Sequence, residues 1–193
     1  MKKIVQKGDH VLEQVAEEIP IEEITTPKIK KILKEMSQAL KSQDDGVAIA
    51  APQIGYSVRI FTVSGKIFED GFAKERENKI ARRNGEEIFE EPDLSQISKK
   101  IKVKDIVFIN PKISKLSKEK VWVPEGCLSV RWLYGKTHRS KKATVEAYDE
   151  DGKHFKMGGS GLLAQIFQHE TDHLNGILFI DHAKEVKEEL PPK

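Results

Sequence analysis

The chain has 193 residues, of which 33% are charged, and its mean hydropathy is −0.51. Its 33 lysines and arginines nearly balance 31 aspartates and glutamates, so the formal net charge of +2 gives no support for DNA as a partner. No stretch approaches the roughly 18 apolar residues of a membrane span, and the N-terminus lacks the apolar run of a signal peptide. We therefore expect one domain over residues 1–193, located in the cytoplasm.

The N-terminal part of the chain predicts two helical segments. Residues 10–19 form an amphipathic turn or two that end at Pro20, and residues 26–43 form a longer helix that Thr26 can cap and that Pro27 suits at its first turn. The apolar positions of the longer helix follow the helical period: Ile29, Ile32, Leu33, Met36 and Leu40.

A charged segment interrupts the middle of the chain. Residues 58–63 are strand-like, and residues 66–105 then become rich in charge, with few apolar positions at any regular period. We interpret residues 66–105 as an insertion, most simply a solvated loop; a lid or a partner-binding hairpin stays open.

The second half of the chain predicts strands followed by one helix. Residues 106–113 and 118–130 are rich in strand formers, and residues 144–148 alternate before a turn at Asp151-Gly152, which is typical of a hairpin. A helix over residues 162–176 follows, with Ser160 as its cap and Gly176 at its stop, and residues 183–193 predict a short exposed helical tail. Strands between an early and a late helix indicate an α+β fold.

The late helix carries two histidines on its apolar face. Placed on a 3.6-residue period, one stripe holds Leu162, Leu163, Ile166, Phe167, His169, Glu170, His173 and Leu174. The opposite stripe holds Gln165, Gln168, Asp172 and Asn175, which we expect to face away from the core.

His169 and His173 lie four residues apart, which lets both imidazoles bind one divalent cation. Glu170 would then lie beside a metal-bound water as a general base. Burying these groups without partners costs several kcal/mol, and a bound cation would supply such a partner. A mixed helix face with hydrogen-bonded histidines near its edge is the alternative.

Cys127 is the strongest candidate for a third ligand. The extended zinc-protease pattern would require a histidine where this chain has Phe179. Cys127, the only cysteine, lies between Gly126 and Leu128 at the end of a strand-like run; alone it would most simply be a buried small residue. Beside the helix it completes a site of two histidines and one thiolate with an open position.

Three separated motifs resemble the peptide deformylase family. They are "GVAIAAPQ" at 46–53, "EGCLS" at 125–129 and "QHETDH" at 168–173, and they occur in the family's order. The resemblance covers nearly the whole chain apart from residues 66–105. It implies mixed or antiparallel sheets packed around a central C-terminal metal-binding helix, with an N-terminal helix.

The resemblance also implies roles for residues. Cys127, His169 and His173 become the metal ligands, with Fe(II) as the expected ion and zinc, nickel or cobalt as alternatives. Glu170 becomes the general base, while the side chain of Gln53 and the backbone N–H of Leu128 form an oxyanion hole. The substrate is expected to contact Gly46, Val47, Ala48, Glu125, Gly126, Leu162 and Ile166. Arg139 and Asp172 are candidates for orienting the ligands.

The implied reaction removes the N-formyl group from the formyl-methionine of a newly made polypeptide through attack of a metal-bound water, releasing formate. Nascent N-formylmethionyl polypeptides are therefore the expected partners, the ribosome near its exit tunnel is a further candidate, and neither DNA nor a membrane is expected. An organelle form without a transit peptide is an alternative to a bacterial-type cytoplasmic one.

Two positions depart from the family pattern and bear on the substrate. Ala48 replaces a second glycine beside the expected groove, and Arg131 stands where the family commonly has proline. They leave open a related hydrolase for another formamide or a short peptide. A non-catalytic binder of N-termini and a metal-free cysteine hydrolase are further alternatives.

Overall fold

The computed structural model of the chain describes residues 2–69, 72 and 103–190. Its helices are α1 (Pro27–Lys41) and α3 (Gly161–Leu174). Its strands are β1 (Ala48–Ala50), β2 (Ile60–Val63), β3 (Ile106–Leu116), β4 (Lys120–Gly126), β5 (Leu133–Ser140), β6 (Lys142–Tyr148), β7 (His154–Ser160) and β8 (Lys184–Glu188).

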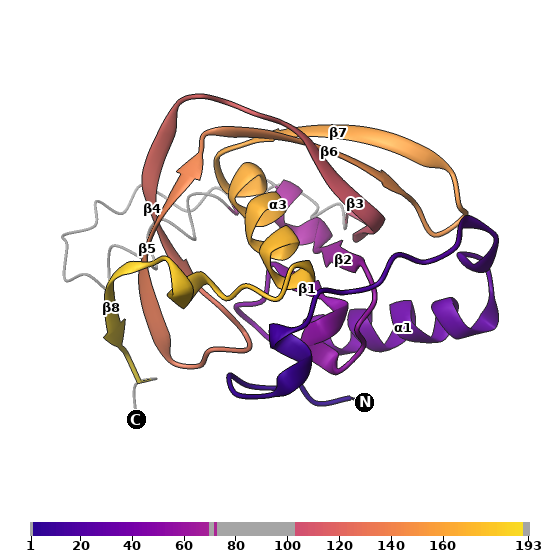
Figure 1. The fold of residues 1–193 in the computed structure, drawn as a ribbon, viewed down its shortest axis with the longest axis horizontal. Helices are drawn as coiled ribbons and strands as arrows, with labels where there is room; N and C mark the ends of the chain where they lie inside the picture. The colour runs from indigo at the N-terminus through magenta and orange to yellow at the C-terminus, as the bar shows by residue number, and fades with distance from the viewer. Residues whose placement is uncertain (1, 70–71, 73–102, 191–193) are drawn as a thin grey trace, which may run out of the picture.

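The strands form two antiparallel sheets around α3. One sheet has the order β1-β2-β3-β6-β7, and the other has the order β4-β5-β8. Helix α3 lies at the centre of the molecule in Figure 1 and contacts strands of both sheets, while α1 lies to one side. The expected α+β fold with a central C-terminal helix is confirmed.

Apolar periodicity accounts for how α1 packs. Ile29, Ile32, Met36 and Leu40 of α1 are buried, as their helical spacing predicts. Thr26 occupies the N-cap position of α1, but its hydroxyl donates to the carbonyl of Glu23 rather than capping the helix.

Three phenylalanines join α3 to the five-stranded sheet. Phe61 and Phe108 stack with ring centroids 4.5 Å apart, and the ring of Phe167 on α3 meets that of Phe108 edge-on at 5.3 Å. The end of α3 is equally fixed, because Gly176 has φ 72° and a Cβ there would lie 2.6 Å from the carbonyl oxygen of Glu13.

The prediction that Gln165 and Gln168 face away from the core is wrong. Both are only 8% exposed. Gln168 accepts from the backbone N–H of Ser140 and donates to its carbonyl, and Gln165 donates to the carbonyl of Pro124. The three-stranded sheet covers this side of α3, so both faces of the helix have protein partners.

The helical prediction for residues 183–193 is also wrong. Lys184–Glu188 forms strand β8, which pairs with β5 at the edge of the smaller sheet. All five residues are exposed, so backbone pairing rather than side-chain burial decides their conformation. Residues 10–19 form only a short 3₁₀ helix, His10–Glu13.

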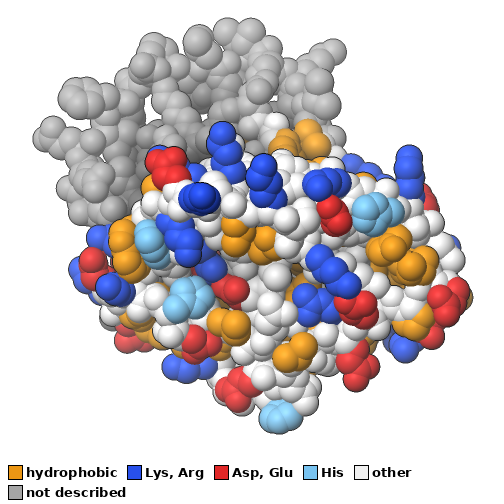
Figure 2. All heavy atoms as spheres, turned by 45° about the horizontal axis from the view of Figure 1, so that its top comes forward, with side chains coloured by type: hydrophobic (Ala, Val, Ile, Leu, Met, Phe, Trp, Pro, Cys, Tyr) orange, Lys and Arg blue, Asp and Glu red, His pale blue; other side chains and the backbone are white. Residues whose placement is uncertain are grey.

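The predicted insertion at 66–105 lies largely outside the described residues. Within the described residues, no helix has the length and apolar character needed to cross a membrane. Figure 2 shows acidic and basic side chains interspersed over the visible face, with hydrophobic ones scattered between them, as the balanced composition suggests.

Candidate metal centre and active site

Cys127, His169 and His173 come together at the junction of the two sheets. Cys127 follows the last residue of β4, and the two histidines lie one turn apart on α3. One potential ligand atom from each lies within 4.8 Å of the others, and Cys127 Sγ lies 3.1 Å from His173 Nε2. The structure therefore brings the three predicted metal ligands into one cluster.

Glu125 fixes the orientation of His169. Its Oε1 lies 2.6 Å from His169 Nδ1, which leaves Nε2 of the ring for the cluster. Burial would raise the pKa of Glu125, but the hydrogen bonds and charges of His169 and Arg139 outweigh it and hold that pKa well below its usual range. Glu125 is thus an ionised carboxylate that accepts a hydrogen bond from the predicted metal ligand His169.

Arg139 connects that carboxylate to a second one. Its guanidinium donates to both oxygens of Glu125, at 3.0 and 2.6 Å, and to Asp172 Oδ2 at 2.6 Å. The side chains of Arg139 and Glu125 are 8% and 2% exposed. Thr137 also donates to Glu125, at 2.5 Å. Both predicted orienting residues therefore connect to His169: Arg139 bonds Glu125, which bonds His169, and Asp172 bonds Arg139.

Glu125 was predicted to contact substrate, whereas its side chain contacts His169, a role that the sequence motifs did not predict. A signal was present, because residues two apart on a strand share a face. Glu125 and Cys127 stand in that relation, so a Cys127 side chain that faces the helix implies that Glu125 faces it too. The role of Thr137 had no comparable signal.

Two buried polar atoms, one in the cluster and one on the residue after His169, lack hydrogen-bond partners among the described residues. They are His173 Nδ1 and Glu170 Oε2. Burial raises the pKa of Glu170 to about 7, although the neighbouring imidazoles of His169 and His173 oppose the shift. Orphaned buried polar atoms are rare and usually mark a missing water, ion or substrate group.

The donor set suits a transition metal. Burial would raise the pKa of the Cys127 thiol, but the imidazoles of His173 and His169 outweigh it and lower that pKa to about 5. One thiolate and two imidazoles match the ligands of iron, zinc, nickel and cobalt. The residues present therefore fit a bound divalent metal.

Gln53 lies against the same cluster. It belongs to the 3₁₀ helix Ala51–Ile54, and its Oε1 accepts from the backbone N–H of Ala50 at 2.8 Å. This contact turns Nε2 toward Ser129 Oγ, at 3.2 Å, and Cys127 Sγ, at 3.5 Å. The buried amide thus points its donor at the cluster, while Leu128 directly follows Cys127 in the chain.

The residues expected to contact substrate lie near two sheet edges. Gly46 and Val47 lead into β1, an edge strand of the larger sheet, and Gly126 ends β4, an edge strand of the smaller one. Both apolar candidates lie on α3: Ile166 is a buried core residue at 3% exposure, and Leu162 is partly buried against the same core.

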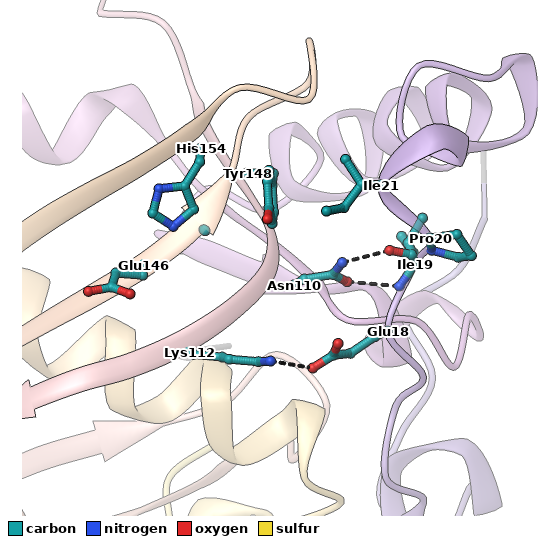
Figure 3. Close-up of a pocket in the computed structure, with 10 residues that line it drawn as sticks. Glu18, Ile19, Pro20, Ile21, Asn110, Lys112, Glu146, Tyr148 and His154 are labelled. Atoms are coloured by element: carbon teal, nitrogen blue, oxygen red, sulfur yellow. Dashed lines mark hydrogen bonds and ion pairs between the residues drawn. The ribbon is translucent and has the colours of Figure 1, made fainter.

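A pocket of about 440 Å³ lies away from the metal cluster, between the N-terminal segment and strands β3, β6 and β7. Figure 3 shows Asn110 bonded to the backbone of Ile19 and Lys112 paired with Glu18 at its wall. None of the predicted site residues lines it. We assign the chemistry to the cluster, because among the described residues only there do candidate metal-ligand atoms and orphaned buried groups coincide.

Comparisons with known proteins agree with this site. A family model described as polypeptide deformylase matches residues 1–189. A peptide deformylase of Carboxydothermus hydrogenoformans is 36% identical over 184 residues, which cover 95% of this chain and 94% of that protein. The chloroplastic peptide deformylase 1A of Solanum lycopersicum is 34% identical over 94% of this chain, which spans 59% of that relative's length.

Solved structures give the same result. The actinonin-bound class I type b peptide deformylase of Acinetobacter baumannii has a TM-score of 0.72 at 25% identity, covering 95% of this chain and 99% of that one. The Met-Ala-Ser-bound form of that protein has a TM-score of 0.71 at 25% identity, covering 94% and 99%. An actinonin complex from Synechococcus elongatus has a TM-score of 0.69 at 28% identity, covering 95% and 79%.

Fold and site together define a hydrolase with a metal-compatible centre. The chain belongs to the polypeptide deformylase family, which makes it an enzyme of protein biosynthesis.

Proposed function

We propose that the protein removes the N-formyl group from the N-terminal formyl-methionine of newly made polypeptides and releases formate. The observation that carries the proposal is the convergence of three distant motifs, because Gln53, Cys127 and the His169–His173 turn meet at one buried point. The Met-Ala-Ser and actinonin complexes of related structures support a peptide substrate.

Cys127, His169 and His173 would hold one divalent ion, and we propose Fe(II). When bound, such an ion supplies Lewis-acid activation of water and of the formyl oxygen. Glu125 and Arg139 hold His169 in the orientation that presents Nε2, so this buried pair serves the ligand rather than the substrate.

Glu170 would act as the proton carrier. It is buried beside the ligand histidines, and no described residue bonds its Oε2. That oxygen would take a proton from the attacking water and deliver it to the departing amine, so that the carboxylate is regenerated in each cycle.

Gln53 Nε2 and the Leu128 N–H would donate to the oxyanion that develops on the formyl group. Gln53 is already held by Ala50, so its donor needs little reorganisation during the reaction. The substrate backbone would pair as an added strand along Val47–Ala48 and Glu125–Gly126, with the methionine side chain near Leu162 and Ile166. Direct contact with the ribosome and a cytoplasmic location remain predictions.

The test is formate release from a formyl-Met-Ala-Ser peptide. Protein loaded anaerobically with Fe(II), and separately with nickel, should release formate, whereas chelator-treated protein and Glu170→Ala should not. Glu119→Ala, at the far end of β4, is the matched control and should behave as the unaltered protein does. No release at full metal occupancy would contradict the proposal, and equal cleavage of unformylated peptides would favour a broader hydrolase.

A further inference from the structure

Arg131 forms a two-pronged contact that the metal centre does not use. Its guanidinium donates to Asp45 Oδ2 at 2.5 Å and to Asp45 Oδ1 at 2.9 Å, and also to Gln43 Oε1 at 2.9 Å. The Arg131 side chain is 19% exposed and that of Asp45 is 55% exposed. Such a fork fixes direction as well as charge, which a lysine or an amide could not reproduce.

This contact ties together the two segments that flank the site. Asp45 directly precedes Gly46 and the segment that enters β1, whereas Arg131 follows Cys127 by four residues. Gln6 reinforces the second segment, because it donates to the carbonyl of Leu128 and accepts from the N–H of Arg131. The pair therefore joins the two chain segments that lie next to the proposed substrate-binding edges.

Tyr134 extends the contact to the opposite edge. Hydrogen bonds and charge from Asp45, with a smaller contribution from Tyr134, outweigh burial and raise the pKa of Arg131. The ring of Tyr134 lies so close to Gly126 that a Cβ on that glycine would be 2.6 Å from a ring carbon. Arg131 is therefore hydrogen-bonded to Asp45, just before β1, and interacts electrostatically with Tyr134, whose ring covers Gly126.

We propose that Arg131 keeps the peptide groove tolerant of charged substrates: its pairing with Asp45 holds the two edges of the groove together and leaves no net charge where the residues after the methionine leave the site. The inference rests on the proposed function. With the pair intact, the groove is nearly indifferent to charge on those residues. Asp45→Asn exposes a cation there, and Arg131→Gln exposes an anion.

The test compares charged peptides in binding and in turnover. Affinities of Met-Ala-Glu amide and Met-Ala-Lys amide for metal-loaded protein are measured by calorimetry, and kcat/KM is measured on their formylated forms. We expect Asp45→Asn to shift the Glu-to-Lys ratio about threefold or more toward Glu, and Arg131→Gln to shift it similarly toward Lys. The shifts should lie in KM rather than kcat and should shrink in about 0.5 M salt.

Three variants make the result specific. Arg131→Lys loses the fork but keeps the charge that neutralises Asp45, so the Glu-to-Lys ratio should stay near that of the unaltered protein. The exchange Asp45→Arg with Arg131→Asp should restore it. Glu146→Gln breaks an exposed pair with Lys156 on the distant β6–β7 hairpin and should not change it.

Unchanged ratios in both single variants would overturn the inference, as would an equal fall of kcat on all peptides, which indicates a purely structural role. Shifted peptide affinities without any formate release would instead contradict the proposed function and leave the role of Arg131 in peptide binding supported.

Discussion

Two arginine–carboxylate pairs of the described structure, Arg139–Glu125 and Arg131–Asp45, use the same guanidinium fork in opposite surroundings. The first is almost fully buried beneath His169, and the second lies at the partly exposed margin of the site. A buried pair must satisfy all of its hydrogen bonds or destabilise the fold, whereas an exposed pair contributes little stability. The difference implies that the buried pair maintains the centre and the exposed pair adjusts what enters it.

Removing one partner of the buried pair should have the largest effect. Arg139→Met leaves Glu125 and Asp172 without their shared donor, so we expect a loss of about 3–5 kcal/mol in the free energy of unfolding. Urea denaturation followed by far-UV circular dichroism measures it. A loss below about 1 kcal/mol would show that the two pairs are energetically alike.

Metal removal should have the next largest effect, and this effect should distinguish the metal centre from the region of the exposed pair. A ligand present at about 1,000 times its Kd stabilises the folded state by about 4 kcal/mol, so chelation should lower the Tm markedly. Hydrogen exchange should accelerate in α3 and around residues 125–129, but not around residues 43–45. Equal acceleration in both regions would mean that the metal stabilises the whole groove rather than the centre.

Glu125→Gln is a smaller chemical change to the buried pair than Arg139→Met. The amide keeps the shape of the side chain but loses the charge that orients His169, so metal affinity should fall about tenfold to a hundredfold. Competition with a chromogenic chelator measures the affinity. Gln43→Glu, at the exposed pair, is the matched control and should leave metal affinity unchanged.

The exposed pair should have the smallest effect, and the effect should depend on pH. Hydrogen bonding to Arg131 lowers the pKa of Asp45 in the folded state, although burial opposes it. Its stabilisation is therefore complete above the ordinary aspartate pKa of about 3.9 and is lost as pH falls below it. Asp45→Asn should reduce stability by less than about 1 kcal/mol near neutral pH, and this difference should disappear as pH falls through the lowered folded-state pKa of Asp45. An undiminished difference at low pH would exclude the ion pair as its source.

The site was more predictable than its surroundings. His169, Glu170 and His173 follow from one short motif whose spacing carries the geometry, and the structure places Cys127 with the two histidines. The burial of Gln168 was not predictable, because its partner Ser140 lies on a strand whose position depends on the whole fold.

The wrong helical prediction for residues 183–193 has the same cause, a partner strand that is distant in sequence. Lys184–Glu188 has a helical composition, and only the open edge of β5 makes it a strand. Local pattern describes a helix well, since its hydrogen bonds lie within the segment, but a strand depends on a partner that the local sequence does not reveal.

The central position of α3 has a consequence for the order of events during synthesis. Both sheets pack on this helix, yet nearly all of their strands leave the ribosome before it does. Until residue 174 is made, the phenylalanines of the larger sheet lack Phe167 and Cys127 lacks its histidines. The chain should therefore stay loosely organised through most of its translation and fold in one late cooperative step.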